Sequence, residues 1–257
     1  MNTKYNYSYD PPPGGTSEWI TRAKYLIEPP ACYLTFAVGI ALAIWLSLSG
    51  SRYGYHILIL LIALPVHELA HALTADRLGD HTPRYYGHIT LNPFAQLNLI
   101  GSFLVLMFGL GWAYVPITPN NLRPNPRTGH MIVAAAGPIA TLLLAFATAI
   151  LWQVLSPAFN LLDGRTYLTM LNMFYFFTYL NIALFIFNLI PLMPLDGFFV
   201  LRGLLPPHLA YQLDKIRPYS NIVFLALFLP PLFTGGRIDF IGPFIFGPAQ
   251  WLARLLY

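Results

Sequence analysis

The segment His67-Glu68-Leu69-Ala70-His71 places two histidines and a glutamate at a spacing that suits a metal-dependent hydrolase. Histidines at positions i and i+4 lie on one face of a helix, so both imidazoles can reach one zinc ion. A glutamate directly after the first histidine projects near the metal and can deprotonate a water molecule there. Catalytic zinc takes three protein ligands and leaves a fourth position for water. The pattern therefore predicts two zinc ligands, His67 and His71, and a general base, Glu68.

The motif lies inside an apolar run, residues 57–78, that is long enough to cross a bilayer. Ionisable side chains are costly in hydrocarbon, and those that occur in membrane spans usually serve a function. Polar side chains in spans can also join neighbouring helices by hydrogen bonds. Two histidines and a glutamate in register favour a metal site over that structural use and over a chance match.

The third ligand should come from another part of the chain, and Asp196 is the carboxylate that ends a second apolar run. Pro191 and Pro194 would break a helix before it, and Gly197 permits a tight turn or close packing after it. On local grounds alone, a capping role at a helix end explains Asp196 equally well. Cys32 is the single cysteine, which excludes most cysteine-ligated metal sites.

The composition excludes an ordinary soluble protein. Of the 257 residues, 56% are hydrophobic and 9% are charged, whereas soluble domains carry about 25% charged residues. The net charge of +4 fits arginines that flank membrane spans better than a nucleic-acid surface, so no nucleic-acid partner is expected. We expect an all-α integral membrane protein with about five or six transmembrane helices. Residues 1–28 should form a flexible polar tail, and residues 29–257 one membrane-embedded domain.

The order of the apolar runs predicts a topology. The candidate membrane segments are residues 31–48, 57–78, 99–117, 131–155, 168–192, 221–233 and 240–257. If both motifs bind one metal, only one complete crossing fits between them, so either 99–117 or 131–155 must enter and return on one side. A re-entrant 99–117 with a cytoplasmic N-terminus places most lysines and arginines in the cytoplasm, whereas a spanning 99–117 divides them equally. We therefore predict a re-entrant 99–117 and a metal site in the cytoplasmic half of the membrane. Whether 240–257 crosses the membrane is left open.

Residues 84–93, of sequence RYYGHITLNP, are rich in β-formers and end in Asn-Pro. This pattern predicts a short strand or β-hairpin directly after the zinc helix. Within it, His88, Ile89 and Thr90 could pair with an unwound substrate by strand addition, because backbone pairing is indifferent to side chains.

The two motifs together resemble the site-2 protease family. Residues 188–197, of sequence NLIPLMPLDG, follow that family's pattern N-x-x-P-x-x-x-L-D-G, and residues 67–71 follow its H-E-x-x-H. The similarity extends through residues 87–93, 111–113, 123–127, 136–138 and 201–207, and covers about residues 55–235. The resemblance implies one zinc ion per chain bound by His67, His71 and Asp196, with Glu68 as general base. It also implies a transmembrane protein substrate, cleaved within the bilayer in regulated intramembrane proteolysis.

A few positions depart from the family pattern. The family often has an asparagine, thought to help stabilise the oxyanion, three residues after Ala136-Gly137-Pro138, where this chain has Thr141. The Thr141 hydroxyl could donate the same hydrogen bond. Relatives of this type often carry a histidine and an aspartate where this chain has Gln96 and Asn98. Asn188 could bind the substrate backbone or satisfy backbone groups near Pro191.

Two other functions are compatible with parts of this pattern. A catalytically degenerate scaffold would bind metal in the membrane without hydrolysis. A transporter would show repeated, scattered polar groups in its spans, whereas here they concentrate at two motifs. We expect a multi-pass protein of a prokaryotic cell membrane, in contact with the lipid bilayer. The substrate's identity and the oligomeric state are left open.

Overall fold

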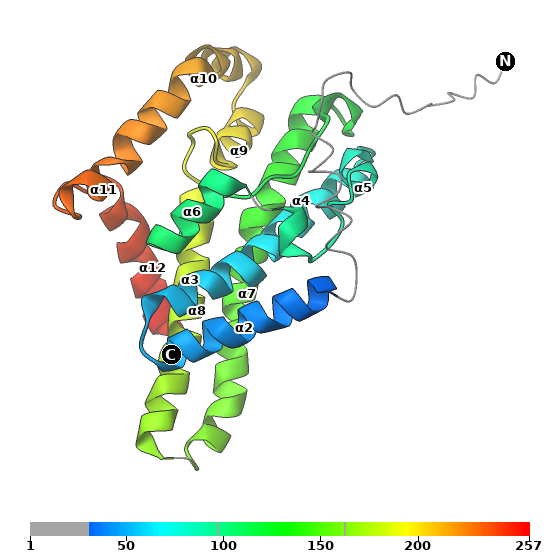
Figure 1. Ribbon diagram of the computed structural model, residues 1–257. Coiled ribbons are helices and arrows are strands. Elements are labelled where there is room, and N and C mark those ends of the chain that lie inside the picture. The colour runs from blue at the N-terminus through cyan, green and yellow to red at the C-terminus, as the bar shows by residue number, and fades with distance from the viewer. Residues whose placement is uncertain (1–30, 97, 162) are drawn as a thin grey trace.

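The computed structural model describes residues 31–96, 98–161 and 163–257, and this part of the chain is helical without a β-strand (Figure 1). The predicted tail, residues 1–28, lies outside the described residues. The elements are, in chain order, α2 (Ala31–Leu48), α3 (Arg52–Leu58), the π-helical η1 (Ile59–Ala63), α4 (Leu64–Arg77), α5 (Thr82–Tyr85), the 3-10 turn η2 (Pro93–Ala95), α6 (Leu99–Phe108), the 3-10 turn η3 (Pro119–Asn121), α7 (Pro126–Phe159), α8 (Gly164–Asn188), α9 (Gly197–Leu204), α10 (Pro207–Phe228), α11 (Pro230–Thr234) and α12 (Gly242–Leu256).

Three helices in the described part are long and apolar enough to cross a membrane, judged by length and composition. They are the continuous helix Arg52–Arg77, which joins α3, η1 and α4, and the helices α7 and α8. Shorter apolar helices are Leu34–Leu48 and α6. The predicted run 221–233 divides between α10 and α11, and the run 240–257 forms the 15-residue α12. The structure thus supports an all-α membrane protein, with three of the five or six expected spanning helices.

The motif helix α4 continues directly from α3 through one π-helical turn. Pro65 has no amide hydrogen, and η1 lies immediately before α4, where the regular hydrogen-bond ladder is interrupted. The buried positions of α4 are 64, 65, 67, 68, 71, 72 and 75, which recur every three or four residues. This face packs against α7, and it carries both histidines of the motif.

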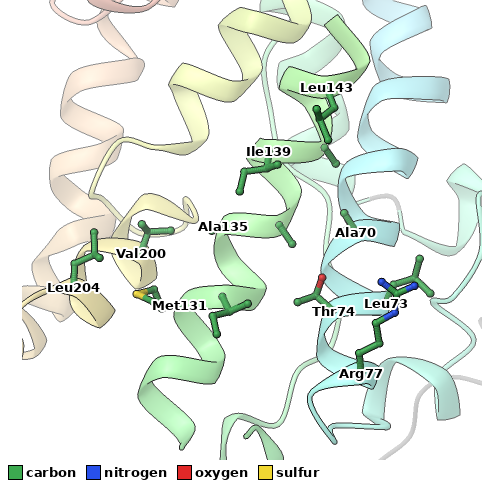
Figure 2. A pocket seen from close by; sticks show the side chains of 13 residues that line it. Ala70, Leu73, Thr74, Arg77, Met131, Ala135, Ile139, Leu143, Val200 and Leu204 are labelled. Atoms are coloured by element: carbon green, nitrogen blue, oxygen red, sulfur yellow. The ribbon is translucent and has the colours of Figure 1, made fainter. Parts of the chain in front are cut away.

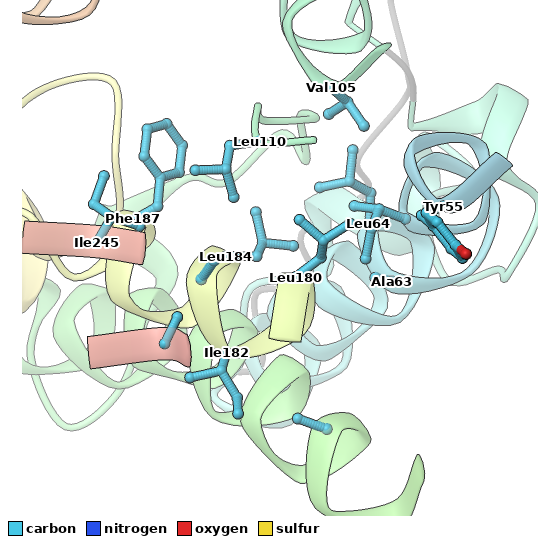
Figure 3. Close-up of a cluster of buried hydrophobic side chains, with 14 of the residues drawn as sticks. Tyr55, Ala63, Leu64, Val105, Leu110, Leu180, Ile182, Leu184, Phe187 and Ile245 are labelled. Atoms are coloured by element: carbon cyan, nitrogen blue, oxygen red, sulfur yellow. The ribbon is translucent and has the colours of Figure 1, made fainter. Parts of the chain in front are cut away.

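Helix α8 lies in the middle of the apolar core (Figure 3). Its side chains Leu180, Leu184 and Phe187 are buried together with Leu64 of α4 and Ile245 of α12. Helix α7 runs alongside α8, and it also packs against α4 and α9 (Figure 1). The loop after α8 is thereby brought to the face of α4 that carries the motif.

Helix α6 and the segment that follows it form a tight reversal. The helix ends at Gly109, whose φ of 76° is in the left-handed region that glycine adopts without strain. The chain then returns in a non-helical path over residues 110–118, and the Tyr114 amide donates to the Gln96 carbonyl at 3.1 Å. The Trp112 backbone lies so close to Gly101 that no Cβ would fit there. The hairpin has the shape expected of a re-entrant segment, and its position in a membrane stays a prediction.

The predicted β-strand over residues 84–93 is wrong. Residues 82–85 form the helical turn α5, whose second residue is Pro83. Residues 86–92 form turns and bends. The carbonyl of Thr90 accepts a hydrogen bond from the Gln96 side chain at 2.7 Å instead of from a neighbouring strand. Gly87, with a φ of 73°, turns the chain within the segment. Local turn geometry and a buried glutamine thus override the β-propensity of these residues.

Candidate active site

The two motif histidines converge on one carboxylate from a distant part of the chain. His67 Nε2 lies 3.1 Å from Asp196 Oδ2, and His71 Nε2 lies 3.3 Å from the same oxygen. The His67 and His71 rings are 4.7 Å apart between centroids, as expected for positions i and i+4 of one helix. Helix α4 and the start of α9 therefore present two nitrogens and one oxygen to a common point.

The position of the Asp196 side chain does not support the capping role. Asp196 precedes the first residue of α9, but its side chain makes no capping hydrogen bond. The carboxylate turns toward the histidines instead. Gly197 lies directly against the Leu189 backbone, where a Cβ would not fit, so the predicted close packing at this glycine is confirmed. The loop over residues 189–196 can fold back onto the end of α8 only because of this small residue.

The donor set fits zinc. Bonds of about 2.0–2.1 Å in a tetrahedral zinc site put neighbouring ligand atoms about 3.3 Å apart, close to the two nitrogen–oxygen distances here. The ligand atoms of His67, His71 and Asp196 all lie within 4.8 Å of one another. His71 Nδ1 lies 2.7 Å from the Val133 carbonyl, and donation to it leaves Nε2 free as a ligand. Such a second hydrogen bond is the usual way that a protein orients a metal-binding imidazole.

Glu68 lies beside this cluster on the same helix. Relative exposures of 3% for His67, 5% for Glu68 and 5% for His71 show that all three side chains are buried. The backbone of Ala113, in the return segment after α6, lies within hydrogen-bonding range of the Glu68 carboxyl group. A buried carboxylate needs such polar partners, and Glu68 has them next to the three ligands.

A cavity of about 470 Å³ adjoins the cluster. Its lining comes from α4, α7, the return segment, the loop before Asp196, α9 and α10: His67, Glu68, His71, Asn98, Trp112, Ala113, Tyr114, Val115, Ile117, Pro119, His130, Ala134, Asn188, Met193, Pro194, Asp196, Phe199 and Arg217. The two motifs and the return segment thus enclose one space in which a peptide could meet the ligands and Glu68.

The family assignment follows from this chain's similarity to known proteins. Residues 55–169 and 162–229 match the model of "Peptidase family M50". The chain belongs to this family, the site-2 protease family. The resemblance expected from the two motifs is therefore confirmed.

Curated relatives of this M50 peptidase come from bacteria. The chain is 38% identical over 180 residues to "Putative zinc metalloprotease YwhC" of Bacillus subtilis, covering 69% of this chain and 81% of the relative. It is 30% identical over 202 residues to "Putative zinc metalloprotease Rip2" of Mycobacterium tuberculosis, covering 76% of this chain and 71% of the relative. No solved structure is significantly similar to the chain. These relatives support a membrane zinc metalloprotease.

Of the other site residues that the sequence predicted for this M50 peptidase, one lines the cavity and the rest do not. Asn188 lines the cavity, and its Nδ2 donates to the Leu184 carbonyl at 3.0 Å. Thr141 is buried, and its hydroxyl donates to the Pro138 carbonyl at 2.8 Å rather than facing the cavity. His88, Ile89 and Thr90 are absent from the cavity lining. The oxyanion role of Thr141 stays a prediction. In the structure, its hydroxyl proton is donated to a carbonyl within α7 and does not point to the cavity.

The Asn98 and Gln96 side chains both make hydrogen bonds to nearby backbone groups. Asn98 lines the cavity and caps α6, since its Oδ1 accepts from the Ile100 and Gly101 amides at 3.1 and 3.0 Å. Gln96 is buried and donates to the Thr90 carbonyl, away from the ligands. Both side chains therefore hold the segment around α6 in shape.

Sequence reasoning missed two members of the cavity, His130 and Arg217. His130 lines the cavity and stacks on Phe199 with 4.0 Å between ring centroids. The predicted span began at residue 131, whereas α7 begins at Pro126. In a helix that begins at Pro126, His130 and Gly137 are seven residues apart and share a face. Gly137 lies against His67 and His71, so the correct helix start would have placed His130 on the side of the motif histidines. No signal in the sequence places Arg217 there.

A second, apolar pocket of about 630 Å³ lies between α4, α7 and α9 (Figure 2). Ala70 and Leu73 of α4, Ile139 of α7 and Val200 of α9 line it, with Arg77 at one end. It shares no lining residue with the cavity that contains the ligands. The larger pocket therefore lacks the chemistry of the site.

Proposed function

We propose that this chain is an intramembrane zinc endopeptidase that hydrolyses peptide bonds within or near transmembrane segments of other membrane proteins. The observation that carries the proposal is the convergence of His67, His71 and Asp196 next to the buried Glu68. The helix that carries His67, Glu68 and His71 is long and apolar enough to cross a membrane. Membership of peptidase family M50 supports it.

The proposed chemistry is a general-base hydrolysis. Zinc bound by His67, His71 and Asp196 would polarise the scissile carbonyl and lower the pKa of water at the site. Glu68, which follows His67 directly, takes a proton from the attacking water and later delivers it to the leaving amine. Asn188, in the same cavity, is placed to hydrogen-bond the substrate backbone.

The substrate has to be extended at the bond to be cut, because helical hydrogen bonds shield its backbone. Residues 88–90, to which the sequence assigned the pairing role, lie in bends, so we assign that role to the non-helical return segment after α6. Ala113, Val115 and Ile117 of this segment line the cavity, and the Val115 amide donates no hydrogen bond within the described residues. An extended peptide could pair with this backbone opposite the ligands.

We further propose a multi-pass orientation with the site in the cytoplasmic half of a prokaryotic cell membrane. The end of α4 and the approach to α7 meet where the Arg123 amide donates to the Leu78 carbonyl at 2.9 Å, which gathers Arg77, Arg84, Arg123 and Arg127 around one end of these helices. Arg165 lies at the opposite end of α7, at the start of α8. By the positive-inside rule, the arginine-rich end is cytoplasmic.

The test measures zinc content and cleavage in the same detergent-purified proteins. Cleavage is assayed on a pool of membrane-spanning reporter segments produced in the same cells. The wild type should hold about one zinc per chain and cleave at least one reporter. Glu68→Gln should keep the zinc and lose cleavage by roughly 10²- to 10⁴-fold, whereas Asp196→Ala should lose both.

Two outcomes would overturn the proposal. Near-normal cleavage by Glu68→Gln would show that this carboxylate is not the base. Wild-type protein that binds zinc and cleaves no reporter would instead fit the metal-binding scaffold, the alternative that the sequence left open.

A further inference from the structure

Arg217 on α10 is a cation in the wall of the catalytic cavity, which it shares with His67, Glu68, His71 and Asp196. Its guanidinium carbon lies 6.0 Å from the centre of the Phe199 ring. No ion pair is formed by this arginine within the described residues. Arg217 is exposed at the edge of this cavity, so an anion from outside the chain can reach its guanidinium.

The acidic residues of the described part are all engaged elsewhere. Asp76 pairs with Arg84 and His81, and Asp214 pairs with Arg202. Asp80 accepts from Thr82, Thr118 and Asn121, Asp163 caps α8, and Asp239 accepts from the Ile241 and Gly242 amides. Glu68 and Asp196 lie at the candidate metal site in the same cavity as Arg217 and form no ion pair with it. The Arg217 guanidinium is therefore available to a carboxylate of another molecule.

An ion pair between two helices holds Arg217 in place. Arg202 of α9 and Asp214 of α10 pair at 2.7 Å, and the two helices lie next to each other (Figure 1). On α9, Phe199 lies three residues, or about one turn, before Arg202 and on the same face. On α10, Arg217 lies three residues after Asp214 and likewise shares its face. The pair thus sets the register that brings Arg217 over the Phe199 ring.

A second contact ties α10 to the loop that carries Asp196. The Met193 amide donates to Ser220 Oγ at 3.0 Å, and Ser220 lies one turn after Arg217 on the same face of α10. His130 stacks on Phe199, the ring that Arg217 also contacts. The position of Arg217 is therefore coupled to the ligand loop, as a substrate-binding residue requires.

The walls near this arginine favour a carboxylate ligand. Trp112, Tyr114, Val115 and Ile117 line the same cavity, and apolar walls strengthen an ion pair relative to bulk water. A guanidinium binds a carboxylate through two parallel hydrogen bonds, which adds geometric selectivity. We propose that Arg217 is a specificity residue that binds an acidic side chain of the substrate segment close to the bond to be cut. This inference rests on the proposed proteolytic function.

The binding test uses the full-length, zinc-loaded Glu68→Gln protein in phosphatidylcholine nanodiscs. The probes are synthetic membrane-spanning peptides of about 20 apolar residues, in which a single Glu is moved through successive positions and compared with Gln at each. At one position the Glu peptide should bind roughly 10-fold more tightly, as a charged hydrogen bond allows. Adding Arg217→Gln should abolish this preference.

Lys215→Gln is the matched control, because it removes the same charge from the same helix. Lys215 lies over the Tyr211 ring, with 4.7 Å between Nζ and the ring centroid, and is absent from the cavity lining. The preference for Glu should survive in this variant. Equal binding of Glu and Gln at every position, absence of peptide binding, or a preference that survives Arg217→Gln would overturn the inference. Loss of the preference when phosphatidylglycerol is added would also overturn it, since a lipid phosphate would then occupy Arg217.

A charge exchange in the active protein separates this inference from the proposed function. Arg217→Glu should prefer a reporter with Lys at the position where the wild type prefers Glu, by a comparable factor in kcat/KM. Unchanged preference in Arg217→Glu would count against the inference. Peptide binding that depends on Arg217, without cleavage of any reporter, would support the inference and count against the protease proposal.

Discussion

Gly137 of α7 lies directly against the two motif histidines, and replacing it by alanine should displace both rings. A Cβ at this position would lie 2.5 Å from His71 Cε1 and 2.6 Å from His67 Nε2. Carbon atoms in ordinary contact are about 3.5 Å apart, so the rings would have to retreat by roughly 1 Å. Metal–ligand distances tolerate only about 0.2 Å. The rings have little freedom to turn away, because both are buried and His71 is bonded to the Val133 carbonyl.

The expected result of Gly137→Ala is a large loss of zinc affinity without loss of the helix. Alanine favours a helix interior over glycine by about 1 kcal/mol, so α7 itself should not be weakened. Changes that disturb the partners of metal ligands typically reduce affinity by about 10- to 100-fold, and the clash here acts on two ligands directly. Competition with a chromophoric chelator measures the affinity, and thermal unfolding in detergent monitors the fold.

Gly247→Ala is the control, because Gly247 also lies inside a helix, α12, and a Cβ there would meet no atom within 4 Å. This variant should bind zinc like the wild type. If Gly137→Ala retains one zinc per chain with wild-type affinity, then α7 does not lie against the histidines as the structure has it, and the reasoning fails.

Two further predictions concern the segment that lines the cavity. Asp80→Ala should lower the free energy of unfolding by about 3 kcal/mol, because the buried Asp80 carboxylate accepts hydrogen bonds from the Thr118 amide and from Thr82 and Asn121. Thermal unfolding in detergent would show this, with Asp80→Asn as a milder change, and equal stability of wild type and alanine variant would contradict it. Val115→Pro removes the amide that we expect to pair with the substrate, so kcat/KM should fall about 10-fold while zinc content stays constant. Unchanged cleavage by a zinc-loaded variant would exclude this pairing.

The clustering of the motif histidines could be predicted from sequence because it is local. The spacing of His67 and His71 matches the helical repeat, so any helix there brings both nitrogens to one side. The scarcity of charge over the whole chain likewise predicted a membrane protein, since so apolar a surface needs lipid around it. Asp196 was the available carboxylate at the end of a second apolar run, which made it the candidate third ligand.

Contacts between elements far apart in sequence were decided by the tertiary structure. Local pattern could not tell a capping Asp196 from a ligand, and only the packing of α8 beside α4 turned its carboxylate to the histidines. Residues 84–93 have the composition of a strand, yet the described part of the chain places no partner strand beside them. A strand needs such a partner for its backbone groups. Thr141 illustrates the same limit, since its hydroxyl proton is donated within α7.

Arg217 shows most clearly what the sequence by itself does not contain. It lies in a stretch of α10 with other charged residues, and nothing in its neighbours distinguishes it from Lys215. It lies three residues from Asp214 and three from Ser220, which contact Arg202 and Met193, and both contacts join separate elements. Helical periodicity reports which residues share a face of one helix, whereas the register between helices is set by packing, and that register selects which cation faces the active site.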